Sequence, residues 1–211
     1  LKVLLKTKSI GTNSDRALLL DFQATLETKP EKAIKLEKDA LAQIENITAD
    51  NARLVSNLHA NLGGLYRMNG HPDLAREHME KSISLLDQFN LLHINDSIPQ
   101  IANYAMFLTE QQEPERGISE LQKLSGIIKK YHSDHCLDYA KVQETLGTIY
   151  LMTANLPQAK THFKRAFKIY EKIWADEPEM IEAKYQEIQE LYPQVGFFLG
   201  QQISSFLTKQ A

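Results

Sequence analysis

The sequence predicts an all-α fold, an α-solenoid of antiparallel helix pairs, and three observations lead to this prediction. The 211-residue chain contains 9 glycines and 7 prolines, too few for a turn-rich β fold. Apolar and small residues recur three and four positions apart, as along 75–86, which is the spacing of one helix face. Pro30, Pro72 and Pro114 follow one another at intervals of 42 residues, and a fixed period of this kind indicates a repeat protein.

Each 42-residue unit is predicted to hold two helices. The first helix carries an apolar motif with a small residue near its centre, and Gly70 suits the left-handed backbone of the turn that follows. A proline then begins the second helix, where its missing N–H needs no partner. Twelve residues after the first small residue, another small residue lets the two helices approach closely. These pairs are Gly63 and Ala75, Ala105 and Gly117, and Gly147 and Ala159.

The same register divides the chain. The repeats are expected at about 14–49, 50–92, 93–134, 135–177 and, in part, 178–192. Ser14 is predicted to cap the first complete helix, with Asp15 near its positive end. Residues 1–13 are expected to be the tail of a truncated preceding repeat with its linker, so we expect at least one more repeat upstream. Residues 193–211, which follow Pro193 and the partial repeat, are predicted to form a capping or interaction helix.

Leu146, Gly147 and Tyr150 are followed by Ala159 and Phe163, a motif that resembles the tetratricopeptide signature nearly in full. The 62–79 unit resembles it closely, and the resemblance extends over roughly residues 14–192. The usual repeat has about 34 residues, and the 42-residue period is similar to the longer variety found in kinesin light chains and bacterial repeat proteins. The resemblance implies a right-handed superhelix with a C-terminal capping helix, and a role in binding proteins.

The composition restricts the partners and the location. Hydrophobic residues make up 43% of the chain and charged residues 24%, as in ordinary globular proteins, and the net charge of −3 gives no basic footprint for nucleic acid. No apolar run is long enough to span a membrane. The single cysteine, Cys136, forms no internal disulfide, which favours a reducing compartment. We therefore expect a cytoplasmic protein that contacts neither nucleic acid nor membrane directly.

Motifs for catalysis or cofactor binding are absent from the sequence. There is no glycine-rich phosphate loop and no nucleophile motif. The densest group of metal-binding residue types, 132–136, has no partner cluster at zinc-ligand spacing. His59, His71, His78 and His162 have no matched partners and are predicted to be surface residues. The sequence therefore predicts no enzyme, no cofactor and no metal site.

The predicted binding face is the concave surface, which the first helices of stacked pairs line. Asn61, Asn103 and Thr145 share one register there, and an asparagine amide can hold the N–H and C=O groups of a peptide backbone. The alternative is that the two asparagines satisfy neighbouring helix ends. The expected ligand is a peptide or a partner helix with an apolar anchor. The predicted peptide-binding residues are Asn57, Asn61, Arg67, Met68, Asn103, Met106, Glu110, Lys141, Thr145, Thr148 and Met152.

Three alternatives remain open at the level of the sequence. The module could be a ligand- or peptide-sensing region of a larger bacterial regulator rather than a simple scaffold. An enzyme using His93, His132 and His135 is the least favoured function. The last helix could mediate a homodimer or another partner contact, through Phe197, Phe198 and Phe206.

Overall fold

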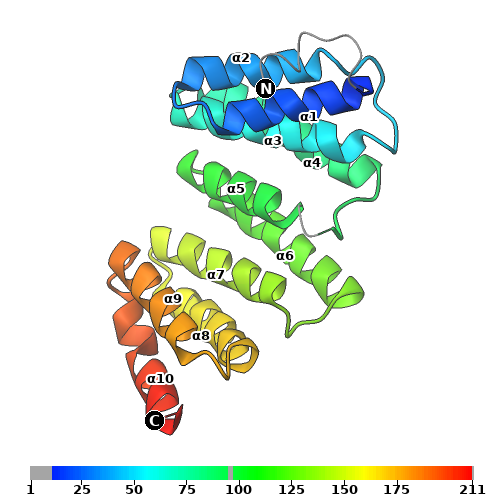
Figure 1. The fold of residues 1–211 in the computed structure, drawn as a ribbon. Helices are drawn as coiled ribbons and strands as arrows, with labels where there is room; N and C mark the ends of the chain where they lie inside the picture. The colour runs from blue at the N-terminus through cyan, green and yellow to red at the C-terminus, as the bar shows by residue number, and fades with distance from the viewer. Residues whose placement is uncertain (1–10, 95–96, 211) are drawn as a thin grey trace. The chain divides into compact units, whose positions relative to one another are not determined.

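The computed structural model describes residues 11–94 and 97–210, and all regular secondary structure in these ranges is α-helical (Figure 1). The prediction of an all-α repeat fold is confirmed. The chain divides between Tyr104 and Ala105, inside α5, into two compact units. The helices are α1 (Asn13–Thr25), α2 (Pro30–Leu41), α3 (Ala52–Met68), α4 (Pro72–Gln88), α5 (Ser97–Glu110), α6 (Pro114–Tyr131), α7 (Leu137–Met152), α8 (Leu156–Ile173), α9 (Pro178–Leu191) and α10 (Val195–Gln210).

The prolines of the 42-residue period begin helices, as predicted. Pro30, Pro72 and Pro114 are the first residues of α2, α4 and α6. Pro157, one residue late in the register, is the second residue of α8. In the first turn of a helix the backbone N–H has no partner within the helix, so proline costs no hydrogen bond there and its fixed φ favours the helical conformation.

The turns before these helices share one backbone geometry. Gly70, Gln112 and Ala154 all adopt positive φ, at 75°, 65° and 58°, and they are 42 residues apart. In each turn the next residue donates its backbone N–H to a carbonyl five positions earlier, which closes the preceding helix. These bonds join His71 to Tyr66 (2.9 Å), Glu113 to Leu108 (2.8 Å) and Asn155 to Tyr150 (2.7 Å).

The paired helices touch where the sequence predicts small residues. A Cβ added to Gly63 would lie 2.5 Å from Cγ of Met79, and one added to Gly117 would lie 2.6 Å from the carbonyl oxygen of Ala105. A Cβ on Gly147 would lie 2.9 Å from the ring of Phe163. Such distances leave no room for a methyl group, so close helix contact explains these glycines.

The predicted cap of the first helix is wrong by two residues. Thr12, not Ser14, is the N-cap of α1: Thr12 Oγ1 accepts the backbone N–H of Asp15, and the Asp15 carboxylate accepts the N–H of Thr12 at 2.6 Å. Thr12 has the extended backbone that an N-cap needs, whereas Ser14 is already helical. Asp15 does lie in the first turn, as predicted. Of the expected tail of a preceding repeat, residues 1–10 lie outside the described residues.

The last helix, α10, packs against α8 and α9 within the second unit. Its buried side chains are Val195, Leu199 and Ile203. Of its three phenylalanines, Phe197 is 89% exposed, while Phe198 and Phe206 are partly buried. Among the described residues, no helix combines the length and the apolar character needed to cross a membrane.

Candidate functional site

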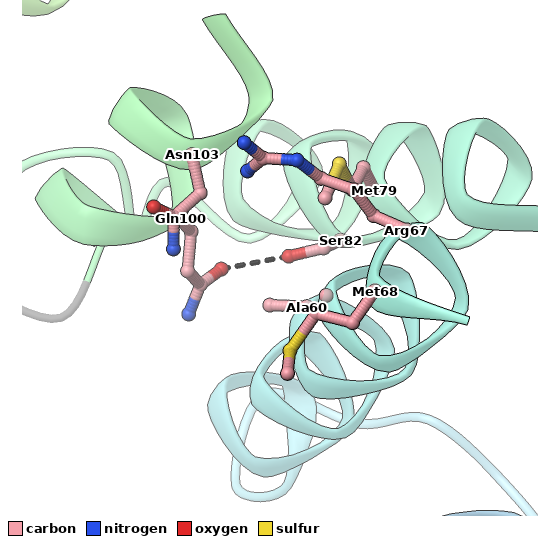
Figure 2. Close-up of a pocket in the computed structure, with 8 residues that line it drawn as sticks. Ala60, Arg67, Met68, Met79, Ser82, Gln100 and Asn103 are labelled. Carbon is pink, nitrogen blue, oxygen red and sulfur yellow. Dashed lines mark hydrogen bonds between the residues drawn. The ribbon is translucent and has the colours of Figure 1, made fainter. Parts of the chain in front are cut away.

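A pocket of about 220 Å³ lies in the first unit, between α3, α4 and the beginning of α5 (Figure 2). It brings together Arg67, Met68 and Asn103, three of the residues that the sequence predicts to bind a peptide. Three further lining residues, Met79, Ser82 and Gln100, were not predicted from the sequence. The complete lining is Ala60, Gly64, Arg67 and Met68 from α3, Met79 and Ser82 from α4, and Gln100 and Asn103 from α5.

Hydrogen bonds hold the base of this pocket. The hydroxyls of Ser56 and Ser82, both buried, donate to Oε1 of Gln100 at 2.9 and 2.7 Å. The Nε2 group of Gln100 in turn donates to Oδ1 of Asn57. The Gln100 carboxamide is therefore fixed in orientation, and Asn57, a predicted peptide ligand, instead supports the wall of the pocket.

The two sides of the pocket differ in polarity. Figure 2 shows Met68 and Ala60 on one side and Arg67 and Asn103 on the other. Met68 is 81% exposed, and a Cβ placed on Gly64 would meet no atom within 4 Å. A flexible exposed methionine beside an open glycine forms an adaptable apolar surface. The amide of Asn103, which is exposed at the rim, offers both a donor and an acceptor.

Asn61, the first of the three residues that share the predicted register, points to the neighbouring helix pair α1 and α2. Its Nδ2 group donates to the carboxyl oxygens of Asp21 at 2.8 Å and Glu37 at 3.3 Å, so both of its N–H groups are occupied. Glu37 is buried, and its Oε2 has no hydrogen-bond partner. Burial, with the nearby charge of Asp21 as a smaller cause, raises the pKa of Glu37 to about 8. A peptide could use only the acceptor oxygen of Asn61.

The remaining predicted ligands belong to the second unit and lie outside this pocket. Thr145 and Thr148 donate their hydroxyls to carbonyls one turn earlier in α7, at 3.0 and 3.1 Å. Met152 is 45% exposed, and Met106 is partly buried. Two charged residues complete the set. They are Glu110, exposed at the end of α5, and Lys141, which lines a separate hollow with Tyr170 and Trp174.

The prediction that the four unmatched histidines are surface residues is wrong for three of them. Nδ1 of His59 lies 2.9 Å from Nδ1 of His78, and the ring of Tyr66 stacks on His78 with centroids 5.4 Å apart. Burial lowers the pKa of His59 to about 4 and also lowers the pKa of His78. Only His71 is exposed as predicted.

An equivalent arrangement occurs 84 residues later in the second unit. His162 Nδ1 lies 2.9 Å from Oε1 of the buried Gln143, and Tyr150 stacks on His162 with centroids 5.3 Å apart. Burial lowers the pKa of His162 to about 4. The shared 84-residue offset of the two tyrosines and the two histidines was the signal from which the sequence could have predicted these contacts.

Residues 132–136, the densest group of metal-binding residue types, contain side chains that form local hydrogen bonds and an ion-pair contact. Cys136 is the N-cap of α7: its Sγ accepts the N–H of Tyr139 at 3.4 Å and donates to the carbonyl of Ser133 at 3.1 Å. Nδ1 of His135 lies 2.6 Å from Oδ1 of Asp134. Within the described part of the chain, no three His, Cys, Asp or Glu residues are placed to share a metal ion.

Comparisons with known proteins agree with this architecture. Residues 97–172 match the family model described as tetratricopeptide repeat. No curated protein matches the chain by sequence. The crystal structure of BtubC (BKLC) from P. vanneervenii is similar, with a TM-score of 0.70 and 18% identity over 92% of this chain and 77% of that one.

Two further solved structures have the same fold. The crystal structure of a Podosopora anserina putative kinesin light chain with nearly identical TPR-like repeats has a TM-score of 0.64 and 14% identity, covering 79% of this chain and 81% of that one. The crystal structure of MamA has a TM-score of 0.56 and 18% identity, covering 81% and 84%. At such identities these likenesses establish the fold alone.

Proposed function

Because this chain is a tetratricopeptide-repeat protein, we propose that it is a non-catalytic scaffold that binds a peptide or partner helix in the pocket above Gly64. Proteins of this family are generally protein-interaction scaffolds. The observation that carries the proposal is the convergence of Arg67, Met68 and Asn103 on one open pocket with a fixed base. Many functions share one fold, so it is this site, and not the fold, that supports the proposal.

The pocket suits a ligand with one large apolar side chain. Ala60, Gly64 and the exposed Met68 provide an apolar surface that burial of such a side chain would remove from water. Ser82 already donates to Gln100, so neither group at the base demands a polar ligand atom. At the rim, Asn103 can pair with the backbone of an extended peptide or with a polar side chain of a helix.

Gly64 allows this proposal to be tested without damage to the core. Leucine at position 64 would fill the pocket, and since no atom lies near the added Cβ, the helix should tolerate the change. Gly126, in α6, is exposed and equally open, so Gly126→Leu is the matched control. Both variants should be slightly more stable than the parent, by about 0.5–1 kcal/mol, because glycine disfavours helix interiors.

The measurement is selection from a phage-displayed peptide library on the parent, followed by titration of the selected peptides. Peptides that bind the parent and Gly126→Leu equally, but bind Gly64→Leu roughly tenfold more weakly or worse, support the proposal. Asn103→Ala should give a smaller loss for the same peptides. Equal binding to Gly64→Leu and the parent would remove this pocket as the peptide site.

A further inference from the structure

A second pocket, of about 360 Å³, lies entirely within the second unit, between the end of α6, the start of α7 and α8. Its walls are rich in basic side chains, although the whole chain has a net charge of −3. Its lining residues are Lys129, Asp134, His135, Tyr139, Arg165, Lys168, Ile169 and Lys172.

The positive charge of this pocket has little internal compensation. Asp134 is the single carboxylate in the lining of the pocket. Its Oδ1 atom lies 2.6 Å from Nδ1 of the adjacent His135. Across the described residues, no carboxylate forms an ion pair with any of its four cationic side chains. A solvated basic helix face would need no hollow, whereas here the cations surround one.

Neighbouring groups position two of these cations. An Nη atom of Arg165 donates to Oε1 of the buried Gln143 at 3.3 Å. Nζ of Lys129 lies 5.2 Å from the ring centroid of Tyr139, a cation–π distance. Lys168 and Lys172, one and two turns further along α8, are exposed. A ligand would therefore meet two ordered cations and two adaptable ones.

The spacing of the charges favours an elongated ligand. Arg165, Lys168 and Lys172 extend over about 10 Å along α8 at the helical rise of 1.5 Å per residue. A single small anion would contact only part of this row. In an extended peptide, alternate side chains lie on one side about 6.8 Å apart, so two or three carboxylates could meet the row together.

We propose that this pocket binds an acidic segment of a partner protein, in which Glu or Asp side chains face α8. Ile169 and Tyr139, both buried, also line the pocket, but the cationic side chains form its accessible surface. This inference is independent of the pocket above Gly64, since it concerns different residues and a different ligand chemistry. Complementary charge would make the association strongly dependent on ionic strength.

The test uses fluorescence anisotropy with a labelled peptide of alternating Glu and Ser residues, and a second peptide with Gln in place of Glu. The variant Lys168→Glu/Lys172→Glu reverses two charges of the pocket. Lys160→Glu/Lys164→Glu is the matched control because it lies on the same helix, has the same four-residue spacing, and changes exposed residues outside the pocket. Circular dichroism should show equal helicity in the two variants and the parent.

The expected result is salt-sensitive binding of the Glu peptide, no binding of the Gln peptide, and a roughly tenfold or greater loss in the pocket variant only. Equal losses in the two variants would show unspecific attraction to α8 and overturn the proposal. Binding of a phosphoserine peptide without binding of the Glu peptide would overturn the assigned ligand. Self-association of the parent in sedimentation, abolished by the pocket variant, would instead assign the pocket to a second copy of the chain.

Discussion

The Nδ1 atoms of His59 and His78 lie 2.9 Å apart, so one imidazole donates its hydrogen to the other. Such a bond requires at least one neutral ring, and burial lowers the pKa of both rings, His59 to about 4. In the second unit Gln143 occupies the position of His59 and accepts from His162. The same position between the two helices of a pair therefore holds a histidine–histidine hydrogen bond in the first unit and a histidine–glutamine hydrogen bond in the second.

This histidine pair should make folding sensitive to acid. Because the folded-state pKa of His59 lies below the unfolded value near 6.5, the unfolded chain binds a proton first as the pH falls, so stability decreases between about pH 6.5 and 4. The variant His59→Gln copies the Gln143 contact and has no imidazole at this position. Between about pH 7 and 5 the variant should lose about 1 kcal/mol less unfolding free energy than the parent. This value already takes into account that His59 is partly exposed.

Urea unfolding at several pH values measures this effect. His71→Gln is the control because His71 is exposed. An unchanged pH dependence in His59→Gln would contradict the assignment of partly buried, neutral rings.

Glu37 should have the opposite pH dependence. Its pKa is raised to about 8 when folded, so it takes up a proton on folding above about pH 4.5, and the protein loses stability as the pH rises towards 8. Glu37→Gln keeps the shape and can still pair with Asp21 and Asn61. The variant should match the parent near pH 5 and exceed it by about 2 kcal/mol near pH 9, as measured by chemical unfolding. The exposed Glu45→Gln should show no such divergence.

Two adjacent glycines in α3 should respond oppositely to alanine. In Gly63→Ala the new methyl group would lie 2.5 Å from Cγ of Met79, so we expect a loss of about 2 kcal/mol from overpacking. In Gly64→Ala nothing lies within 4 Å, and the higher helix propensity of alanine should add about 0.5–1 kcal/mol. Thermal and urea unfolding measure both. The double variant Gly63→Ala/Met79→Ala should lose less than the sum of its single changes, because truncation of Met79 removes the clash.

The exposed ring of Phe197 provides a test of the alternative that α10 mediates a homodimer. With 89% of its surface accessible, this ring is available to a partner. If α10 forms the contact, sedimentation velocity should show a dimer of the parent and a monomer of Phe197→Ser. Leu191→Ser, on α9, is the control because Leu191 is 68% exposed. A parent that remains monomeric at all concentrations would contradict the dimer prediction.

The sequence predicted those features that depend on local chemistry. Proline at the start of a helix and Gly70 in a turn obey constraints on their own backbone, so their positions in the chain were sufficient. The side-chain contacts of Asn61 depend on partners 24 and 40 residues away, whose orientation no pattern in the chain encodes. The contacts of His78 and His162 did leave a signal, the 84-residue offset that they share with Tyr66 and Tyr150, and the prediction missed it. The repeat register alone was enough to place Arg67 and Met68 on one helix. That Gln100 and Ser82 also line the pocket depends on how α5 packs against α4, which the register does not give.

The turns at Gly70, Gln112 and Ala154 have the same backbone path with three different residues. The same main-chain hydrogen bond closes each of them, and it does not depend on which side chain stands at the position of positive φ. A 42-residue segment cut between two of these turns, such as α4 with α5, could be inserted at the third with matching backbone geometry at both ends. Duplication or deletion of 42 codons at these turns would therefore add or remove one repeat and leave the backbone geometry of every turn unchanged.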